Sequence, residues 1–222
     1  PVDEFREAAA LGIHTRPVLV GPLTFLFLGR LKGTDTNRYD LLEKILPIYE
    51  NVLSQLAAAG ADWVQIDEPI LSLDLPVEAT TALRPTYERL SGVSDKIRLC
   101  LATYFGDLRD HLPAALKLPV AAVHLDLVRA PEQLSRALDL VPDGPTLSLG
   151  VVDGRNVWRT DLERALGLLE KATAKLGAER VIVAPSCSLL HTPMDLDNEP
   201  TLDAELKSWM AFAMQKLQEV KT

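Results

Sequence analysis

Cysteine is scarce in this chain of 222 residues, since only Cys100 and Cys187 occur and they lie far apart. Neither has a second cysteine close by, which excludes the paired spacing of a zinc ribbon. Such sparse cysteine is typical of a reducing compartment, where disulfides do not persist. We therefore expect a cytoplasmic protein.

Excess basic charge and long apolar runs are also lacking. The chain has 23 Lys and Arg against 31 Asp and Glu, a net charge of -8. Binding to phosphate backbones needs clustered Lys and Arg, so we expect no nucleic-acid partner. No apolar run approaches the ~20 residues that span a bilayer, and the first residues lack the basic and apolar regions of a signal peptide. We expect no membrane partner either.

Apolar residues are plentiful, at 47% of the chain, and they can form one sizeable core. The default is therefore a single domain over residues 1–222. The sequence does not begin with methionine, so we expect it to be a piece of something longer.

Apolar runs alternate with segments of helical periodicity along the whole sequence. The pattern predicts strands at residues 17–22, 63–69, 97–105, 122–128, 146–153 and 180–185. Helices are expected at residues 3–11, 39–59, 78–90, 107–117, 131–140, 160–177 and 201–220, with a surface loop at 29–38. Thr160 and Glu163 form a predicted capping box for the helix at 160–177.

Strict alternation of strand and helix predicts an α/β fold with a parallel sheet. Polar residues follow several of the strands, which favours a (β/α)8 TIM-type barrel, where function gathers at the carboxyl ends of the strands. Such a barrel takes eight strands, so about six of its eight units are present. An open doubly wound sheet is the second choice, because the glycine-rich phosphate loop expected of it is absent.

Two carboxylates, Asp67 and Glu68, stand where the second strand ends and Pro69 stops the ladder. A strand end of this kind is a place for binding or catalysis. The simpler alternative is that Asp67 caps the next turn and Glu68 is solvated. We predict that both contact a substrate, and the alternative stays open.

A second polar segment, DGRNVWR at residues 153–159, follows the fifth strand. Arg155 could bind a carboxylate or phosphate through two parallel hydrogen bonds, and Asp153 lies beside it. Alternatively, Asp153 and Asn156 shape a turn and the arginines pair with nearby acids. We predict that Asp153 and Arg155 contact a substrate.

Cys187 and His191 stand four residues apart after the last strand. If that segment is helical, they share a face and could hold a metal or act as nucleophile and base. Two ligands are too few for a zinc site without others nearby. His124, inside the fourth strand, is expected to be packed or hydrogen-bonded.

These segments carry a resemblance to a known family. The runs GPLTF (21–25), WVQIDEP (63–69), DGRNVWR (153–159), PSCSLLHTP (185–193) and LKSW (206–209) are similar to the amino-terminal barrel of cobalamin-independent methionine synthase. The resemblance covers essentially the whole chain, as strands 3 to 8 of that barrel. It implies a methyltransferase that moves a methyl group from 5-methyltetrahydropteroyltriglutamate to homocysteine, with zinc held in a second, catalytic barrel that this chain lacks.

The resemblance also implies that this barrel has no catalytic zinc. Of the four ligand positions in the family's catalytic barrel, Asp126 and Cys187 stand at two, but Leu99 and Leu101 stand at the others. Two ligands cannot complete a zinc site. We expect no catalytic residue, no cofactor and no activity in the isolated chain, which would serve as a scaffold beside the second barrel. Asp67 stands where the catalytic barrel holds its amino-acid substrate.

Two other functions remain open. One is a stand-alone small-molecule enzyme that uses Asp67, Glu68, Asp126 and Asp153 for acid-base chemistry. The other is an interaction module that docks onto a catalytic barrel encoded separately.

Overall fold

The computed structural model describes residues 1–33 and 36–222, and the chain divides into two compact units within it. The division falls inside strand β4 (Ala122–Asp126), so the single domain over 1–222 stays a prediction. Unit 1 comprises Pro1–Thr103, Leu108–Val123 and Val141–Pro145; unit 2 comprises Tyr104–Asp107, His124–Leu140 and Thr146–Thr222.

All six predicted strands are present, and they follow one another in the order β1-β2-β3-β4-β5-β6. The pairs β1–β2, β2–β3 and β5–β6 are parallel, which confirms the α/β class and the incomplete barrel of six strands. The apolar strands suit parallel sheets, which are covered on both faces. The other strands are β1 (Val18–Val20), β2 (Trp63–Asp67), β3 (Arg98–Ala102), β5 (Thr146–Val152) and β6 (Val181–Pro185).

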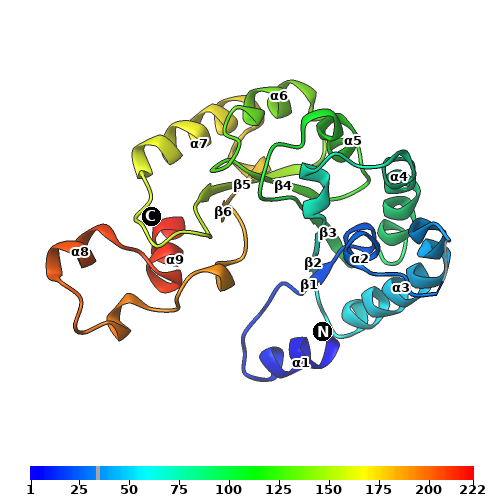
Figure 1. The fold of residues 1–222 in the computed structure, drawn as a ribbon, viewed down its shortest axis with the longest axis horizontal. Helices are drawn as coiled ribbons and strands as arrows, with labels where there is room; N and C mark the ends of the chain where they lie inside the picture. Colours follow the sequence, from blue (N-terminus) through cyan, green and yellow to red (C-terminus); the bar gives the residue numbers. More distant parts are fainter. Residues whose placement is uncertain (34–35) are drawn as a thin grey trace. The chain divides into compact units, whose positions relative to one another are not determined.

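Several helices of unit 1 pack on one another beside the first three strands (Figure 1). The longest, α3 (Leu42–Ala58), buries Leu42, Leu46, Leu53 and Leu56 at helical spacing and contains Pro47. Arg89 joins it to α4 (Val77–Ser91) through an ion pair of 2.8 Å with Glu50. The others are α1 (Val2–Ala10), α2 (Pro22–Leu28) and α5 (Leu112–Leu116), with short 3-10 turns at Arg38–Leu41, Pro69–Ser72 and Arg109–His111.

Unit 2 contains α6 (Gln133–Leu140) and α7 (Leu162–Leu176), which pack against each other. Two short helices, α8 (Ala204–Trp209) and α9 (Ala213–Lys221), end the sequence given, and α9 packs on β5 and β6. Single 3-10 turns occur at Ala178–Arg180, Leu189–His191 and Leu196–Asn198.

The continuous closing helix predicted at 201–220 is wrong, because the chain extends at Met210 between α8 and α9. Met210 forms an antiparallel bridge with Trp158, and the Ala211 N–H donates to the Val157 carbonyl at 2.9 Å. These bonds to a distant segment replace the helical ones. Local periodicity carries no information about such a partner.

The predicted capping box at Thr160 is also wrong. Asp161 is the N-cap of α7, and its side chain accepts from the Arg164 N–H at 3.0 Å. The Thr160 hydroxyl instead donates to Glu219 at 2.8 Å. A carboxylate outcompetes the local cap site because it accepts from both the N–H and the hydroxyl of Thr160.

The loop predicted at 29–38 includes residues 34–35, which lie outside the described residues. Within the described part of the chain, no helix is long and apolar enough to cross a bilayer.

Candidate functional site

Asp67 and Glu68, at the end of β2, differ sharply in exposure. Val64 and Ile66 are buried along one side of the strand, and Glu68 continues this side with 0% of its surface exposed. Asp67 continues the other, half-buried side. The two carboxylates have different environments because successive side chains of a strand point to opposite faces.

Glu68 binds the beginning of α2 within unit 1. Its carboxylate accepts from the Leu23 N–H at 3.1 Å, the Thr24 N–H at 2.7 Å and the Thr24 hydroxyl. The hydroxyl of Tyr87 lies 3.5 Å away. The first N–H groups of a helix have no acceptor within the helix, so Glu68 stabilises α2 by supplying one.

Burial raises the pKa of Glu68 to about 7, although the hydrogen bonds from Thr24, Leu23 and Tyr87 lower it. Desolvation outweighs these bonds because the carboxylate has no contact with water. The solvated Glu68 of the alternative interpretation is therefore wrong. Its predicted contact with a substrate stays a prediction, and its visible contacts are internal to unit 1.

Gly21, directly after β1, lies very close to the side chain of Glu68. Its backbone is extended, with φ -65° and ψ 149°, which any residue adopts. A Cβ at this position would overlap the carboxyl group of Glu68. Glycine is thus required here because a larger side chain would not fit beside Glu68, and not because of the backbone conformation.

Asp67 is hydrogen-bonded by a side chain of its own strand. The Gln65 side-chain amide donates to its Oδ1 at 2.8 Å, and both residues are half-buried. Residues two apart on a strand share a face, so this bond fixes the carboxylate on that face. A polar ligand could contact Asp67 from the solvent side.

In unit 2, Asp153 shapes the turn that follows β5. Its carboxylate accepts from the Arg155 N–H at 2.8 Å and from the Asn156 side chain at 2.9 Å. Arg129 lies 3.5 Å from the same carboxylate. The turn-shaping interpretation is therefore correct for Asp153 and Asn156, and it positions Arg155.

Lys216 of α9 is buried and binds this turn through its ammonium group. Its ammonium group donates to the Asn156 side chain and to the Trp158 carbonyl, each at 2.9 Å. Burial lowers the pKa of Lys216. Asp153 thus binds the first residues of the turn, and Lys216 binds Asn156 and Trp158.

The guanidinium of Arg155 is exposed and lies 4.4 Å from the centre of the Phe105 ring. No carboxylate pairs with it among the residues that the structure describes. The His191 ring meets Phe105 edge-on, with centroids 5.7 Å apart. Stacking fixes the orientation of a guanidinium and leaves its N–H groups available to an anion.

Phe105 has a left-handed backbone, with φ 77°, which is uncommon for a bulky residue. The carboxylate of Asp126, which is 1% exposed, accepts the Phe105 N–H at 3.0 Å. It also accepts from the N–H groups of Val128 at 3.1 Å and Arg129 at 2.9 Å. Asp126 therefore stabilises the strained residue on which Arg155 stacks.

The residues expected at the four ligand positions do not fit a catalytic zinc. The Asp126 carboxylate accepts three backbone N–H groups, and burial raises the pKa of the Cys187 thiol to about 11. Leu99 and Leu101 are buried and offer no donor atom. Within residues 1–33 and 36–222, no three His, Cys, Asp or Glu side chains gather as a metal site.

Cys187 and His191 do not share a helical face. Cys187 is buried, and a short turn at Leu189–His191 begins after it, with Ser188 as its cap. His191 instead packs on Phe105. His124 is hydrogen-bonded as expected, with Nδ1 3.0 Å from the Ser148 hydroxyl and Nε2 3.1 Å from the Ser186 carbonyl.

Sequence reasoning missed Phe105, Arg129 and Lys216 at this site. Arg129 and Lys216 reach the turn from residues distant in sequence, so no local pattern identifies them. The two units each hold part of the predicted set: Asp67 and Glu68 are in unit 1, Asp153 and Arg155 in unit 2. The binding role of these four residues stays a prediction.

Comparison with known proteins decides the family. Residues 1–177 match the model of the cobalamin-independent synthase N-terminal domain. The chain belongs to this family. The resemblance expected from the sequence runs is thereby confirmed.

Relatives of the cobalamin-independent synthase family match the chain over nearly its full length. The 5-methyltetrahydropteroyltriglutamate–homocysteine methyltransferase of Salinibacter ruber is 54% identical over 220 residues, covering 99% of this chain and 28% of the relative. The methyltransferase of the same name from Saccharomyces cerevisiae is 52% identical over 222 residues, covering 99% and 29%. The chain thus spans under a third of the length of these relatives.

A solved structure has the same fold. It is a B12-independent methionine synthase from Shewanella sp. W3-18-1 in complex with selenomethionine, with a TM-score of 0.74 and 17% identity. The match covers 99% of this chain and 64% of that one. This likeness supports the incomplete barrel fold.

Proposed function

We propose that this chain is the scaffold part of an enzyme that transfers a methyl group from 5-methyltetrahydropteroyltriglutamate to homocysteine. The observation that carries the proposal is identity of 54% and 52%, over essentially the whole chain, to two methyltransferases of that name. The zinc that activates homocysteine would be held by a second barrel, as the family resemblance implies. The second barrel is thus the partner of this chain.

The role proposed here is architecture and ligand contact, without catalysis. The donor set supports it, because Leu99 and Leu101 offer no atom that coordinates a metal and Asp126 already accepts three backbone N–H groups. Cys100 and Cys187 are both free thiols, which supports a cytoplasmic location.

Arg155 and Asp67 are the proposed substrate contacts. Arg155 presents a stacked guanidinium that would bind a carboxylate, a group that a polyglutamate tail supplies. Asp67 would bind a polar or cationic group. Asp153 and Glu68 complete the predicted set as positioning residues, because Asp153 holds the Arg155 backbone and Glu68 holds α2.

A chimera tests the proposal. This chain would replace the matching segment of the Salinibacter ruber methyltransferase, and methionine formation from homocysteine and 5-methyltetrahydropteroyltriglutamate would be measured. We expect activity within about tenfold of the parent, and none from the isolated chain, because the catalytic barrel is required.

Variants of the chimera test the two contacts. Arg155→Ala should raise KM for the methyl donor several-fold with little change in kcat, whereas Arg84→Ala, on exposed α4, serves as the control. Asp67→Asn should change kcat by less than about tenfold. A loss of several orders of magnitude in kcat with the fold intact, or turnover by the isolated chain, would show that the chemistry lies in this barrel.

A further inference from the structure

A small pocket of about 150 Å³ lies in unit 2, beside the turn that follows β5. Three buried residues line it from three elements: Leu127 directly after β4, Val151 near the end of β5, and Ala165 in the first turn of α7. Ligands of parallel barrels bind at this carboxyl end of the strands. The pocket is therefore well placed for a ligand.

Two arginines of this pocket have no acidic partner. Arg159 and Arg164 both line it, and both are exposed. Among the residues that the structure describes, neither forms an ion pair with a carboxylate. Arg159 makes one long hydrogen bond, from its Nε to the Met210 carbonyl at 3.4 Å. A guanidinium binds a carboxylate through parallel hydrogen bonds, so both side chains are available to an anion.

The acids near the pocket have other partners. Asp153 accepts two hydrogen bonds within its own turn and pairs with Arg129 at 3.5 Å. Asp161 caps α7 through one carboxylate oxygen. Glu219 accepts from the N–H and the hydroxyl of Thr160. None of these acids occupies the two guanidiniums, which stay open to a ligand.

Size and an apolar wall restrict this ligand further. Sites for drug-sized molecules measure about 300–1,000 Å³, so a pocket of about 150 Å³ admits only a small ligand. Leu168 joins Leu127, Val151 and Ala165 to form an aliphatic wall. A short hydrocarbon chain would be buried against this wall, whereas a bare inorganic anion would gain nothing from it.

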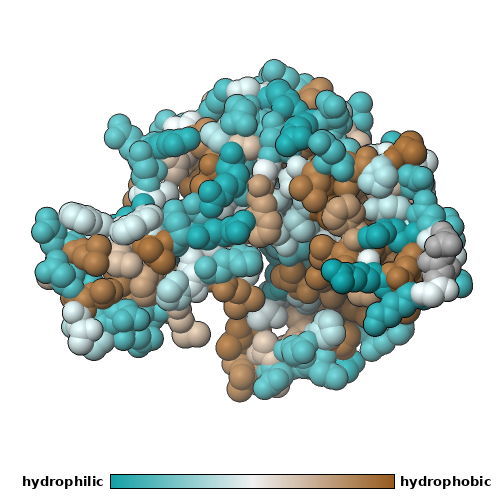
Figure 2. Space-filling view, viewed as in Figure 1, coloured by the Kyte–Doolittle hydropathy of each residue, from teal (hydrophilic) through white to brown (hydrophobic). Residues whose placement is uncertain are grey.

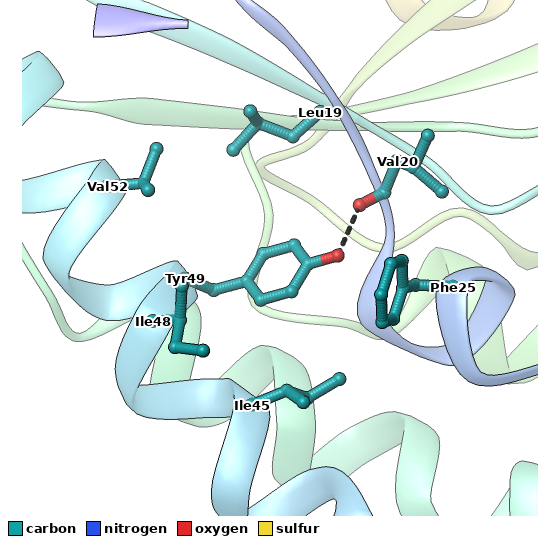
Figure 3. Close-up of a pocket in the computed structure, with 7 residues that line it drawn as sticks. All are labelled: Leu19, Val20, Phe25, Ile45, Ile48, Tyr49 and Val52. Atoms are coloured by element: carbon teal, nitrogen blue, oxygen red, sulfur yellow. Dashed lines mark hydrogen bonds between the residues drawn. The ribbon is translucent and has the colours of Figure 1, made fainter. Parts of the chain in front are cut away.

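A groove in unit 1 has the opposite chemistry. It measures about 340 Å³ and lies between β1, α2 and α3 (Figure 3). Its one side-chain polar group, the Tyr49 hydroxyl, already donates to the Val20 carbonyl at 2.7 Å. Figure 2 shows hydrophobic residues at the surface where α2 and α3 lie in Figure 1, and mostly hydrophilic residues where α6 and α7 lie. The groove thus offers an anion no partner, unlike the pocket of unit 2.

We propose that the pocket lined by Arg159 and Arg164 binds a small aliphatic carboxylate. The carboxylate would accept from both guanidiniums, and the hydrocarbon chain would lie on the aliphatic wall. Two sources supply this chemistry: a simple short-chain acid, and an aliphatic α-amino acid whose ammonium group would donate to Asp161. The proposal rests on the geometry of unit 2 and not on the proposed function.

An NMR titration of the 222-residue chain with valerate tests the proposal, and isothermal titration of the chimera described above tests the same pocket in a second protein. The amide signals of Asp161 and Arg164 should shift, with a Kd in the millimolar range or tighter. Valerate should bind at least about threefold more tightly than acetate, because it buries more methylene groups. Butylamine, which has a similar chain and the opposite charge, should not bind.

Norvaline distinguishes the two sources of the ligand. Tighter binding of norvaline than of valerate would assign the pocket to an α-amino acid, because its ammonium group gains Asp161 as a partner. Weaker binding of norvaline would assign it to a simple acid. Both results agree with an aliphatic carboxylate as the ligand.

Matched variants locate the contact. Arg164→Gln and Arg159→Gln each remove one guanidinium and keep a long polar side chain, so each should weaken valerate binding about tenfold. Lys175→Gln removes a positive charge from the same helix outside the pocket and should leave Kd unchanged. Circular dichroism must show that the variants keep the fold.

Three outcomes would overturn the proposal. Valerate would bind neither the folded chain nor the chimera, or Lys175→Gln would weaken binding as much as Arg164→Gln. Alternatively, phosphate or butylamine would bind as tightly as valerate, which would remove the aliphatic carboxylate as the preferred ligand. Arg155→Ala, which tests the proposed function, should leave valerate binding unchanged, and Arg164→Gln should leave KM for the methyl donor unchanged. The two proposals therefore fail separately.

Discussion

Replacing Glu68 with alanine is expected to lower the free energy of unfolding by about 3–5 kcal/mol. The change removes the acceptor of the Leu23 and Thr24 N–H groups inside unit 1 and leaves a cavity beside Tyr87. Urea unfolding followed by circular dichroism measures the loss. Glu78→Ala, on an exposed side chain of α4, should stay within about 0.5 kcal/mol of the unmodified chain.

A substitution at Gly21 provides a control for the contact between Gly21 and the Glu68 carboxyl group. Gly21→Ala alone should destabilise the chain because its methyl group overlaps the Glu68 carboxyl group. In the Glu68→Ala background the same change should cost less by about 1–3 kcal/mol. If Glu68→Ala prevents folding, Glu68→Asp replaces it in the cycle, because it keeps a carboxylate but shortens the side chain that Gly21 faces. Strict additivity of the two substitutions would contradict the contact.

Replacing Asp126 with alanine is expected to cost about 2–4 kcal/mol, because three N–H groups lose one buried acceptor. Phe105 also loses the bond that holds its left-handed backbone. The measurement is urea unfolding of the isolated chain, with hydrogen exchange at the Phe105 amide as a local readout.

Asp126→Asn separates the loss of the Phe105 bond from the loss of the bonds to Val128 and Arg129. The asparagine oxygen still accepts from Val128 and Arg129, while its amide faces the Phe105 N–H, so the loss should be intermediate and exchange at Phe105 faster. Asp139→Ala, on an exposed side chain in unit 2, should change stability by less than about 0.5 kcal/mol. Unchanged exchange at Phe105 in Asp126→Ala would refute the role assigned to this carboxylate.

The strands were predictable because each is an apolar run between turn residues. The alternation of side chains along β2 also indicated on which side of the strand Glu68 lies. Val64, Ile66 and Glu68 lie on one buried side of β2, so alternation alone could have placed the glutamate inside. What the sequence could not supply is the partner of a buried carboxylate. That partner is the first turn of α2, more than 40 residues away in the chain.

The same limit explains the errors at the end of the sequence. The periodicity of residues 201–220 is helical, yet Met210 pairs with Trp158 and interrupts the helix. Thr160 matched a local capping pattern, yet Glu219 binds it from α9. At the site, Asp153 and Asn156 were identified as turn residues from their type, whereas the stacking of Arg155 on Phe105 depends on the packing of two distant loops.

Metal analysis of the purified chain tests most directly the claim that this barrel serves as a scaffold without a zinc site. The chain would be incubated with zinc, dialysed and measured by mass spectrometry, beside the variant Cys187→Ser. We predict far less than one zinc per chain, with no difference between the two proteins, because Leu99 and Leu101 cannot coordinate and Asp126 already accepts backbone N–H groups. One tightly retained zinc per chain that Cys187→Ser abolishes would contradict the account.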